Sequence, residues 1–176
     1  MATDTLLWRE MRRKHYVAVA ALLGLIISAR PLPSRVAHTS VAPEYRITDL
    51  RAHLFFSDRG TFSDDLLKRK DLALWNTIIG AGDAGGPSSA TLLVVEVSGA
   101  PGSYPNGRRV ELAVRTARKE IFRRQLSLGV LGPQGHTYVA FWLYDTGCES
   151  LTVSTALLGQ VESTRRVAAI PFHCGE

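Results

Sequence analysis

From residue 45 onward, apolar and polar side chains alternate in short runs that are separated by turn-forming residues. In the first run, Leu50, Leu54 and Phe56 lie on one side of the chain and His53 lies on the other. Because successive side chains of a β-strand point to opposite faces, this period of two predicts a half-buried strand. Ser, Asp, Arg and Gly follow at 57–60, so we expect a turn there.

The chain continues in the same way towards its C-terminus. Six further runs have the length and composition of strands: 91–97, 110–115, 122–131, 137–144, 151–158 and 167–172. The first of these is apolar on both faces and is predicted to be an interior strand, whereas the second is predicted to be more exposed. Proline and glycine at 132–135 are typical of a tight turn, so we expect the third and fourth runs to form a hairpin.

The segment between the first two predicted strands has no regular alternation. Ser63, Asp64 and Asp65 precede two leucines, which predicts a capped helical turn. Residues 72–79 are mixed in character, and we expect them to form an irregular crossover.

About seven strands predict an all-β domain at residues 44–176. They suffice for two antiparallel sheets packed face to face, with Phe141 and Trp142 in or near the core. A fold that alternates strands and helices would need several helices of about ten residues or more between the strands, and the intervals here are turns and loops. We therefore expect an antiparallel β-sandwich of immunoglobulin-like or C2-like topology.

The N-terminal part of the chain has a different pattern. Residues 16–29 contain no charge, and basic side chains stand directly before them. Because positive charge stays on the cytoplasmic side, the pattern predicts a cytoplasmic tail at 1–11 that can form an interfacial helix, a transmembrane helix at 12–30 and an extended linker at 31–43. The residues expected at the membrane interfaces are Trp8, Arg9, Arg12, Arg13, Lys14 and Arg30.

The length of this apolar segment leaves two interpretations open. Residues 16–29 rise about 21 Å as a helix, less than the roughly 30 Å of a hydrocarbon core, and they equally fit the apolar region of a cleaved signal peptide. An uncleaved anchor is favoured because the helix can extend back through Met11, Lys14 and Arg30 can snorkel, and an Ala-x-Ala cleavage pattern is missing. The domain would then lie in the periplasm, anchored to a bacterial inner membrane.

The net charge of +5 does not predict a nucleic-acid-binding protein. Residues 1–43 hold six Arg or Lys and two Asp or Glu, so most of the excess lies beside the apolar segment and the rest of the chain is nearly neutral. Such a distribution is typical of a topology signal rather than of a phosphate-binding surface.

The two cysteines, Cys148 and Cys174, each adjoin a glycine near the end of the chain. They are too few for a structural zinc site and too far apart for a redox Cys-x-x-Cys pair. Two free thiols or one disulfide remain, and a disulfide is favoured if the domain lies outside the cytoplasm.

Motifs for catalysis, cofactors or metals are weak throughout the chain. Gly80, Gly82 and Gly85 match the dinucleotide pattern G-x-G-x-x-G, but the required helix is absent, so a flexible loop is the preferred interpretation. The five histidines lack metal-binding spacing, and a Gly-x-Ser-x-Gly elbow is missing. We predict no catalytic, cofactor or metal site, and hence no enzyme.

Two groups of surface residues suggest binding instead. One is a basic cluster on two neighbouring predicted strands, which would either dock an acidic subunit or headgroup, or form a solvated edge that discourages aggregation. Its members are Arg108, Arg109, Arg115, Arg118, Lys119, Arg123 and Arg124. The other comprises Trp75, Tyr104, Trp142 and Tyr144, which could form a platform for a sugar, although aromatic side chains on strands are more often in the core.

This architecture leads to two functional hypotheses. The preferred one is a non-catalytic accessory subunit of a larger bacterial membrane complex, photosynthetic or respiratory, whose partners are integral membrane protein subunits and the lipid bilayer. The alternative is a membrane-tethered binding module for a glycan, a lipid headgroup or a secreted protein.

Overall fold

The computed structural model describes residues 45–146 and 148–174. The predicted tail at 1–11, helix at 12–30 and linker at 31–43 lie outside these residues, as do the predicted interface residues Trp8, Arg9, Arg12, Arg13, Lys14 and Arg30. In the part of the chain that is described, no helix has the length and apolar character needed to span a membrane.

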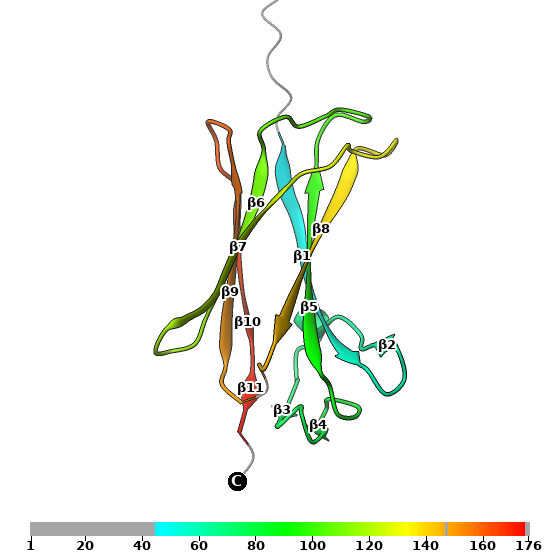
Figure 1. The fold of residues 1–176 in the computed structure, drawn as a ribbon, viewed down its shortest axis with the longest axis vertical. Coiled ribbons are helices and arrows are strands. Elements are labelled where there is room, and N and C mark those ends of the chain that lie inside the picture. Colours follow the sequence, from blue (N-terminus) through cyan, green and yellow to red (C-terminus); the bar gives the residue numbers. More distant parts are fainter. Residues whose placement is uncertain (1–44, 147, 175–176) are drawn as a thin grey trace, which may run out of the picture. The chain divides into compact units, whose positions relative to one another are not determined.

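The described residues form two antiparallel sheets that face one another (Figure 1). Their strands are β1 (Arg46–Phe56), β2 (Thr61–Phe62), β5 (Ala90–Ser98), β6 (Arg109–Arg115), β7 (Glu120–Ser127), β8 (His136–Tyr144), β9 (Leu151–Leu158) and β10 (Arg165–Ile170). The first sheet has the order β2-β1-β5-β8, and the second has the order β10-β9-β6-β7. The all-β, sandwich-like architecture is as predicted.

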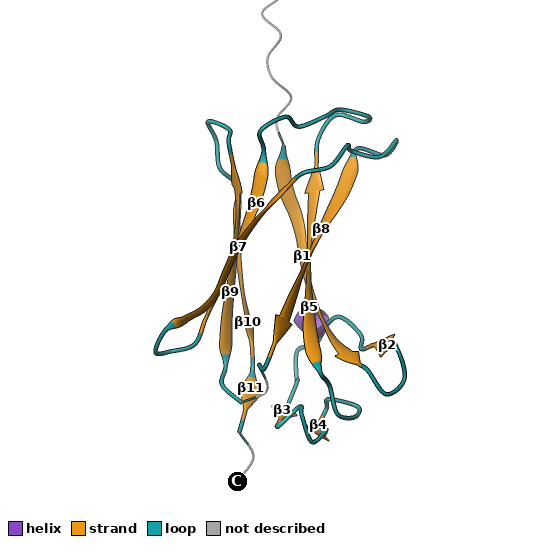
Figure 2. Cartoon of the chain, viewed as in Figure 1, coloured by secondary structure: helices purple, strands orange, loops and turns teal. Residues whose placement is uncertain are grey.

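A third, smaller sheet lies beyond these two. It consists of β11 (Phe172–His173), β3 (Leu74–Trp75) and β4 (Ala81–Gly82), and its β11–β3 pair is parallel. A single turn of 3₁₀-helix, η1 (Leu66–Lys68), is the purple element in Figure 2. Asp65 caps it as predicted, because its Oδ1 accepts hydrogen bonds from the N–H groups of Leu67 and of Ala52 in β1.

Alternation along the strands fills the space between the two sheets. In β1 the side chains of Leu50, Ala52, Leu54 and Phe56 are buried, as the period of two predicted. The largest fully buried side chains come from both sheets, from β3 and β11, and from the loop before β8: Phe141, Phe172, Leu54, Leu74, Leu93, Leu112, Leu131, Leu151, Leu157 and Ile170.

The predicted hairpin between residues 122–131 and 137–144 is wrong. β7 pairs with β6 in the second sheet, whereas β8 pairs with β5 in the first. The turn itself forms, with Gly135 N–H donating to Gly132 O at 2.9 Å. Leu128 and Leu131 are buried where the chain passes from one sheet to the other. Burial of these two apolar side chains favours the crossing between the sheets over the expected hairpin.

Two details of burial also differ from expectation. The run 110–115 was expected to be more exposed than the run 91–97, but β6 lies between β9 and β7, and Ala113 is only 4% exposed. Phe141 is buried as predicted, whereas its neighbour Trp142 points to the outer face of the first sheet and is 38% exposed. Adjacent strand residues face opposite sides, so only one of these two side chains can enter the core.

Three loops and Tyr45 are connected at one end of the sandwich, which we call the N-terminal end. The loops are 99–108, 128–135 and 159–164. Gln160 donates from Nε2 to the carbonyl of Tyr45 at 2.8 Å, and Gly99 N–H donates to Gly135 O at 2.9 Å. The small sheet, which includes β11, and the β6–β7 turn lie at the opposite, distal end (Figure 1).

Candidate functional site

The outer face of the first sheet has an aromatic cluster near its distal end. Phe55 of β1 stands between Phe62 of β2, at 5.2 Å between ring centroids, and Trp142 of β8, at 5.5 Å in an edge-to-face arrangement. Phe62 is 47% exposed and Tyr144, the next outward residue after Trp142, is 64% exposed. Strand pairing brings Trp142 of β8 next to Phe55 and Phe62, which lie about 80 positions earlier in the sequence.

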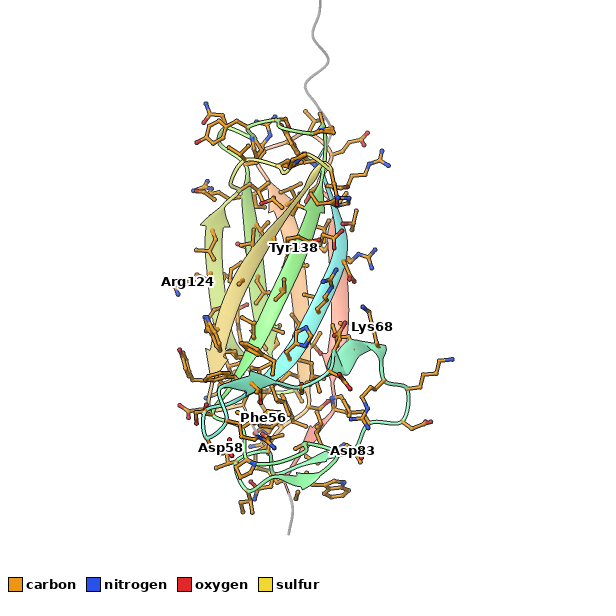
Figure 3. All side chains as sticks on the ribbon, turned by 90° about the vertical axis from the view of Figure 1, so that its right-hand side faces the viewer. Phe56, Asp58, Lys68, Asp83, Arg124 and Tyr138 are labelled. Carbon is orange, nitrogen blue, oxygen red and sulfur yellow. A yellow bond between two sulfur atoms is a disulfide. The ribbon has the colours of Figure 1, made fainter. Side chains whose placement is uncertain are left out.

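The other half of this face is a polar network. Arg51 contacts Asp49 through Nε at 2.8 Å and Glu96 through Nη2 at 2.7 Å, and it lies over the ring of Tyr138. His136 Nδ1 is 3.1 Å from Glu96 Oε1 but makes no hydrogen bond of good geometry, so the contact counts as an ion pair only when the imidazole is protonated. Figure 3 labels Tyr138 on this face of the sandwich.

The contact between Asp49 and Arg51 shifts the pKa of both side chains. Burial alone would raise the pKa of the Asp49 carboxyl, but hydrogen bonds from the Arg51 side chain and the Leu50 N–H outweigh it and hold that pKa below its ordinary value. The hydrogen bond to Asp49 likewise raises the pKa of Arg51. Both groups are therefore charged at neutral pH, and the face pairs an apolar half with an ionic half.

The predicted basic cluster follows the β6–β7 hairpin but does not gather on one face. Arg108 precedes β6, and Arg109 and Arg115 are its two end residues. Arg118 and Lys119 lie in the turn, and Arg123 and Arg124 lie in the middle of β7. In the strand register Arg123 is opposite Ala113, whereas Arg124 is opposite the buried Leu112. The side chains of Arg123 and Arg124 therefore leave β7 on opposite faces of the sheet.

Acidic neighbours neutralise the middle of this hairpin. Arg123 contacts Glu111 Oε1 through Nη1 at 2.6 Å and Glu120 Oε2 through Nη2 at 2.7 Å. The hydrogen bond from Arg123 lowers the pKa of Glu120 below its ordinary range and raises that of the guanidinium. Within the described residues the other six members of the cluster form no ion pair, so their positive charge is spread along the hairpin.

A cavity of about 450 Å³ opens beside this turn. Arg118 and Lys119 line it on one side, and Asp145 and Glu149 line it together with the disulfide-bonded Cys148. Opposite charges on its walls give the cavity no net preference for an anion or a cation. Among residues 45–146 and 148–174, no cluster of His, Cys, Asp and Glu is arranged to hold a metal ion.

The cysteines form the predicted disulfide. Cys148 and Cys174 are bonded at 2.07 Å and are separated by 26 positions in the sequence. The bond joins the segment before β9 to the residue after β11, so β9 and β10 both lie within the closed loop.

The four aromatic residues considered for a sugar platform are not brought together. Trp75 lies on β3 at the distal end, 5.3 Å from the ring of His173, and Tyr104 lies in a loop of the N-terminal end. Trp142 and Tyr144 share the outer face of β8. Residues 80–85 were expected to form a loop; they contain turns on either side of the two-residue strand β4.

Sequence reasoning missed Phe55 and Phe62 as members of the aromatic cluster. A signal was present, since Phe55 occupies an outward position in the alternating run of β1. The matching position on β2 could not be found in this way, because β2 has only two residues and no period.

Comparison with known proteins does not identify relatives of this chain. No protein-family model matches it, and a search of curated proteins finds no match. The proposal of function therefore rests on the site itself.

Proposed function

We propose that the chain is a non-catalytic accessory subunit of a larger bacterial membrane complex, photosynthetic or respiratory. Its N-terminal segment would anchor it in the inner membrane, and its periplasmic β-sandwich would stabilise or position integral membrane partners. The observation that carries the proposal is the aromatic cluster of Phe55, Phe62 and Trp142 on the outer face of the first sheet, where Phe62, Trp142 and the nearby Tyr144 are exposed. Exposed aromatic side chains gathered on one face are typical of surfaces that another molecule covers.

The strand order supports an immunoglobulin-like rather than a C2-like topology. Of the seven long strands taken in chain order, the first, second and fifth form one sheet, and the seventh, sixth, third and fourth form the other. In immunoglobulin-like sandwiches strands A, B and E share one sheet, and strands C, F and G share the other. Domains of this architecture commonly present one sheet face or the loops at one end to a partner.

Mild solubilisation of native membranes tests the subunit hypothesis. We expect the chain to migrate in an assembly much larger than its own 19.3 kDa, together with integral membrane proteins. Pigment in the same fraction would identify a photosynthetic assembly, and haem a respiratory one. A chain that migrates alone in every mild detergent would contradict the proposal.

A second candidate function, a tethered glycan-binding module, is supported by the contacts of Trp142 with the rings of Phe55 and Phe62 on an open sheet face. Sugar rings stack on such side chains while nearby polar groups bind their hydroxyls. Trp142→Ala should then abolish binding of the complete chain to a glycan array, and Trp75→Ala at the distal end serves as the matched control. Equal binding by both variants would exclude the aromatic cluster as the sugar site.

A further inference from the structure

Strand β8 is an edge strand without the features that normally protect an edge. It forms one side of the first sheet and pairs only with β5 within the described residues. Its nine residues, His-Thr-Tyr-Val-Ala-Phe-Trp-Leu-Tyr, include no Lys, Arg, Asp, Glu or Pro. The register with β5 runs from Ser98–His136 to Ala90–Tyr144 without a bulge. Long, flat and uncharged edges of this kind readily accept another strand.

The remaining edges of the two main sheets are all protected. β2 has two residues, which is too short to template a neighbouring strand, and it pairs only with the last two residues of β1. Along the rest of β1, the side chains of Thr164, Asp65 and Ser63 accept hydrogen bonds from N–H groups at this edge. In the second sheet β7 carries Arg123 and Arg124 and β10 carries Arg165 and Arg166. Charged side chains on an edge discourage pairing with another strand, so the contrast singles out β8 among the described edges.

The chemistry of this edge fits an extended polypeptide. An edge strand offers a row of backbone N–H and C=O groups, which an added strand satisfies directly. On the outer face, Ala140 leaves a gap between the exposed rings of Tyr138 and Trp142. An apolar side chain of an added strand fits that gap, because cross-strand neighbours on one face lie about 5 Å apart.

Charge favours a different protein over a second copy of this chain. Arg124 of β7 lies on the side of the sandwich along which β8 runs (Figure 3), and no ion pair or hydrogen bond of its side chain occurs within the described residues. Two copies joined through β8 would bring their Arg124 side chains towards the same seam. A partner that places an acidic side chain there gains an ion pair instead.

We propose that β8 receives an uncharged, extended segment of a partner subunit as an additional strand of the first sheet, with an acidic side chain of that partner near Arg124. This inference rests on the proposed function and identifies the contact through which the subunit would join its complex. The side chains of the added strand would lie beside Trp142 and extend the aromatic cluster along the outer face.

A pair of lysine substitutions tests the edge in the complete chain. Ala140→Lys places a charge on the exposed outer face of β8, and Ala169→Lys places the same charge at an exposed position on β10, the edge of the other sheet. We expect Ala140→Lys to reduce the fraction of chain found in the large assembly about tenfold or more, since it buries an unpaired charge in the contact. Ala169→Lys should leave that fraction unchanged.

Hydrogen exchange of the wild-type chain gives a second measurement that does not depend on folding of a variant. Backbone amides of 137–144 should exchange several-fold more slowly in the assembly than in the separated chain, whereas those of β10 should not change. Equal exchange of β8 in both states would overturn the inference.

The outcomes separate this inference from the proposed function. If wild type and Ala140→Lys are both found in the assembly to the same extent, the edge contact is overturned and the subunit role stands. Wild type migrating alone would overturn both. If wild type forms a species of twice the chain's own mass and Ala140→Lys does not, β8 pairs with a second copy of this chain. That result would overturn the inference that β8 binds a different subunit.

Discussion

Removal of the Cys148–Cys174 disulfide should destabilise the domain mainly through the unfolded state. The cystine closes a loop with a sequence separation of 26 residues. In the chain-entropy model, loss of a cross-link over this distance costs about 3.5 kcal/mol of unfolding free energy at 25 °C. The folded domain should change little, because β9 and β10 stay paired through the register from Arg165–Ala156 to Ile170–Leu151.

Urea unfolding of the complete chain in mild detergent measures this difference. Wild type, Cys148→Ser and the double variant Cys148→Ser/Cys174→Ser are compared, with tryptophan fluorescence as the signal. Both cysteines are exposed, so serine introduces no buried hydroxyl. The single and double variants should lose the same free energy, since either one removes the cross-link.

The size of the loss decides whether the reasoning holds. A loss below about 1 kcal/mol would refute the chain-entropy argument, because it would mean that the unfolded chain gains little freedom when the loop opens. A single variant much less stable than the double variant would point instead to an effect of the remaining thiol in the folded state.

Three further predictions concern the core, a turn and the ionic half of the first sheet. Phe141→Ala should lower the unfolding free energy by about 4 kcal/mol, because the ring is 2% exposed between the sheets; urea unfolding measures this. Gly135→Ala should lower the melting temperature more than Gly102→Ala: both glycines have a positive φ, but an added Cβ at Gly135 meets Gly99 O at 2.5 Å whereas at Gly102 it meets nothing within 4 Å. Asp49 has a folded pKa below its unfolded value of about 3.9, so its contribution is present above that value and is lost as pH falls through the folded pKa. The stability difference between wild type and Asp49→Asn should therefore shrink as pH decreases from about 6 to about 2, and a difference independent of pH would contradict the assignment.

Alternation along single strands was the most informative feature of the sequence. It located β1 and β9, because a period of two defines both the strand and its buried face. It also required Phe141 and Trp142 to face opposite sides, although it could not say which of them is buried. That choice depends on the position of β8 in the sheet, which is a tertiary property.

Pairing between strands was much less predictable. The turn at 132–135 shows that the chain reverses, but it does not determine which sheet the next strand joins. Burial of Leu128 and Leu131 directs β8 to the first sheet, away from β7. The aromatic cluster depends on the same pairing, so Trp142 could be recognised as a candidate from the sequence but its neighbours Phe55 and Phe62 could not. The ion pairs of Arg123 were likewise hidden, and a count of basic residues overstated the positive charge of the hairpin.

The positions of the two chain ends have a mechanical consequence. β1 begins at the N-terminal end of the sandwich, and β11 leads the chain out at the distal end (Figure 1). Tension between these two points acts along β1, across the nine residue pairs that it shares with β5. Because antiparallel hydrogen bonds run perpendicular to the strands, they are loaded together in shear and are not opened one at a time. The domain would thus withstand traction applied between the start of β1 and the end of β11.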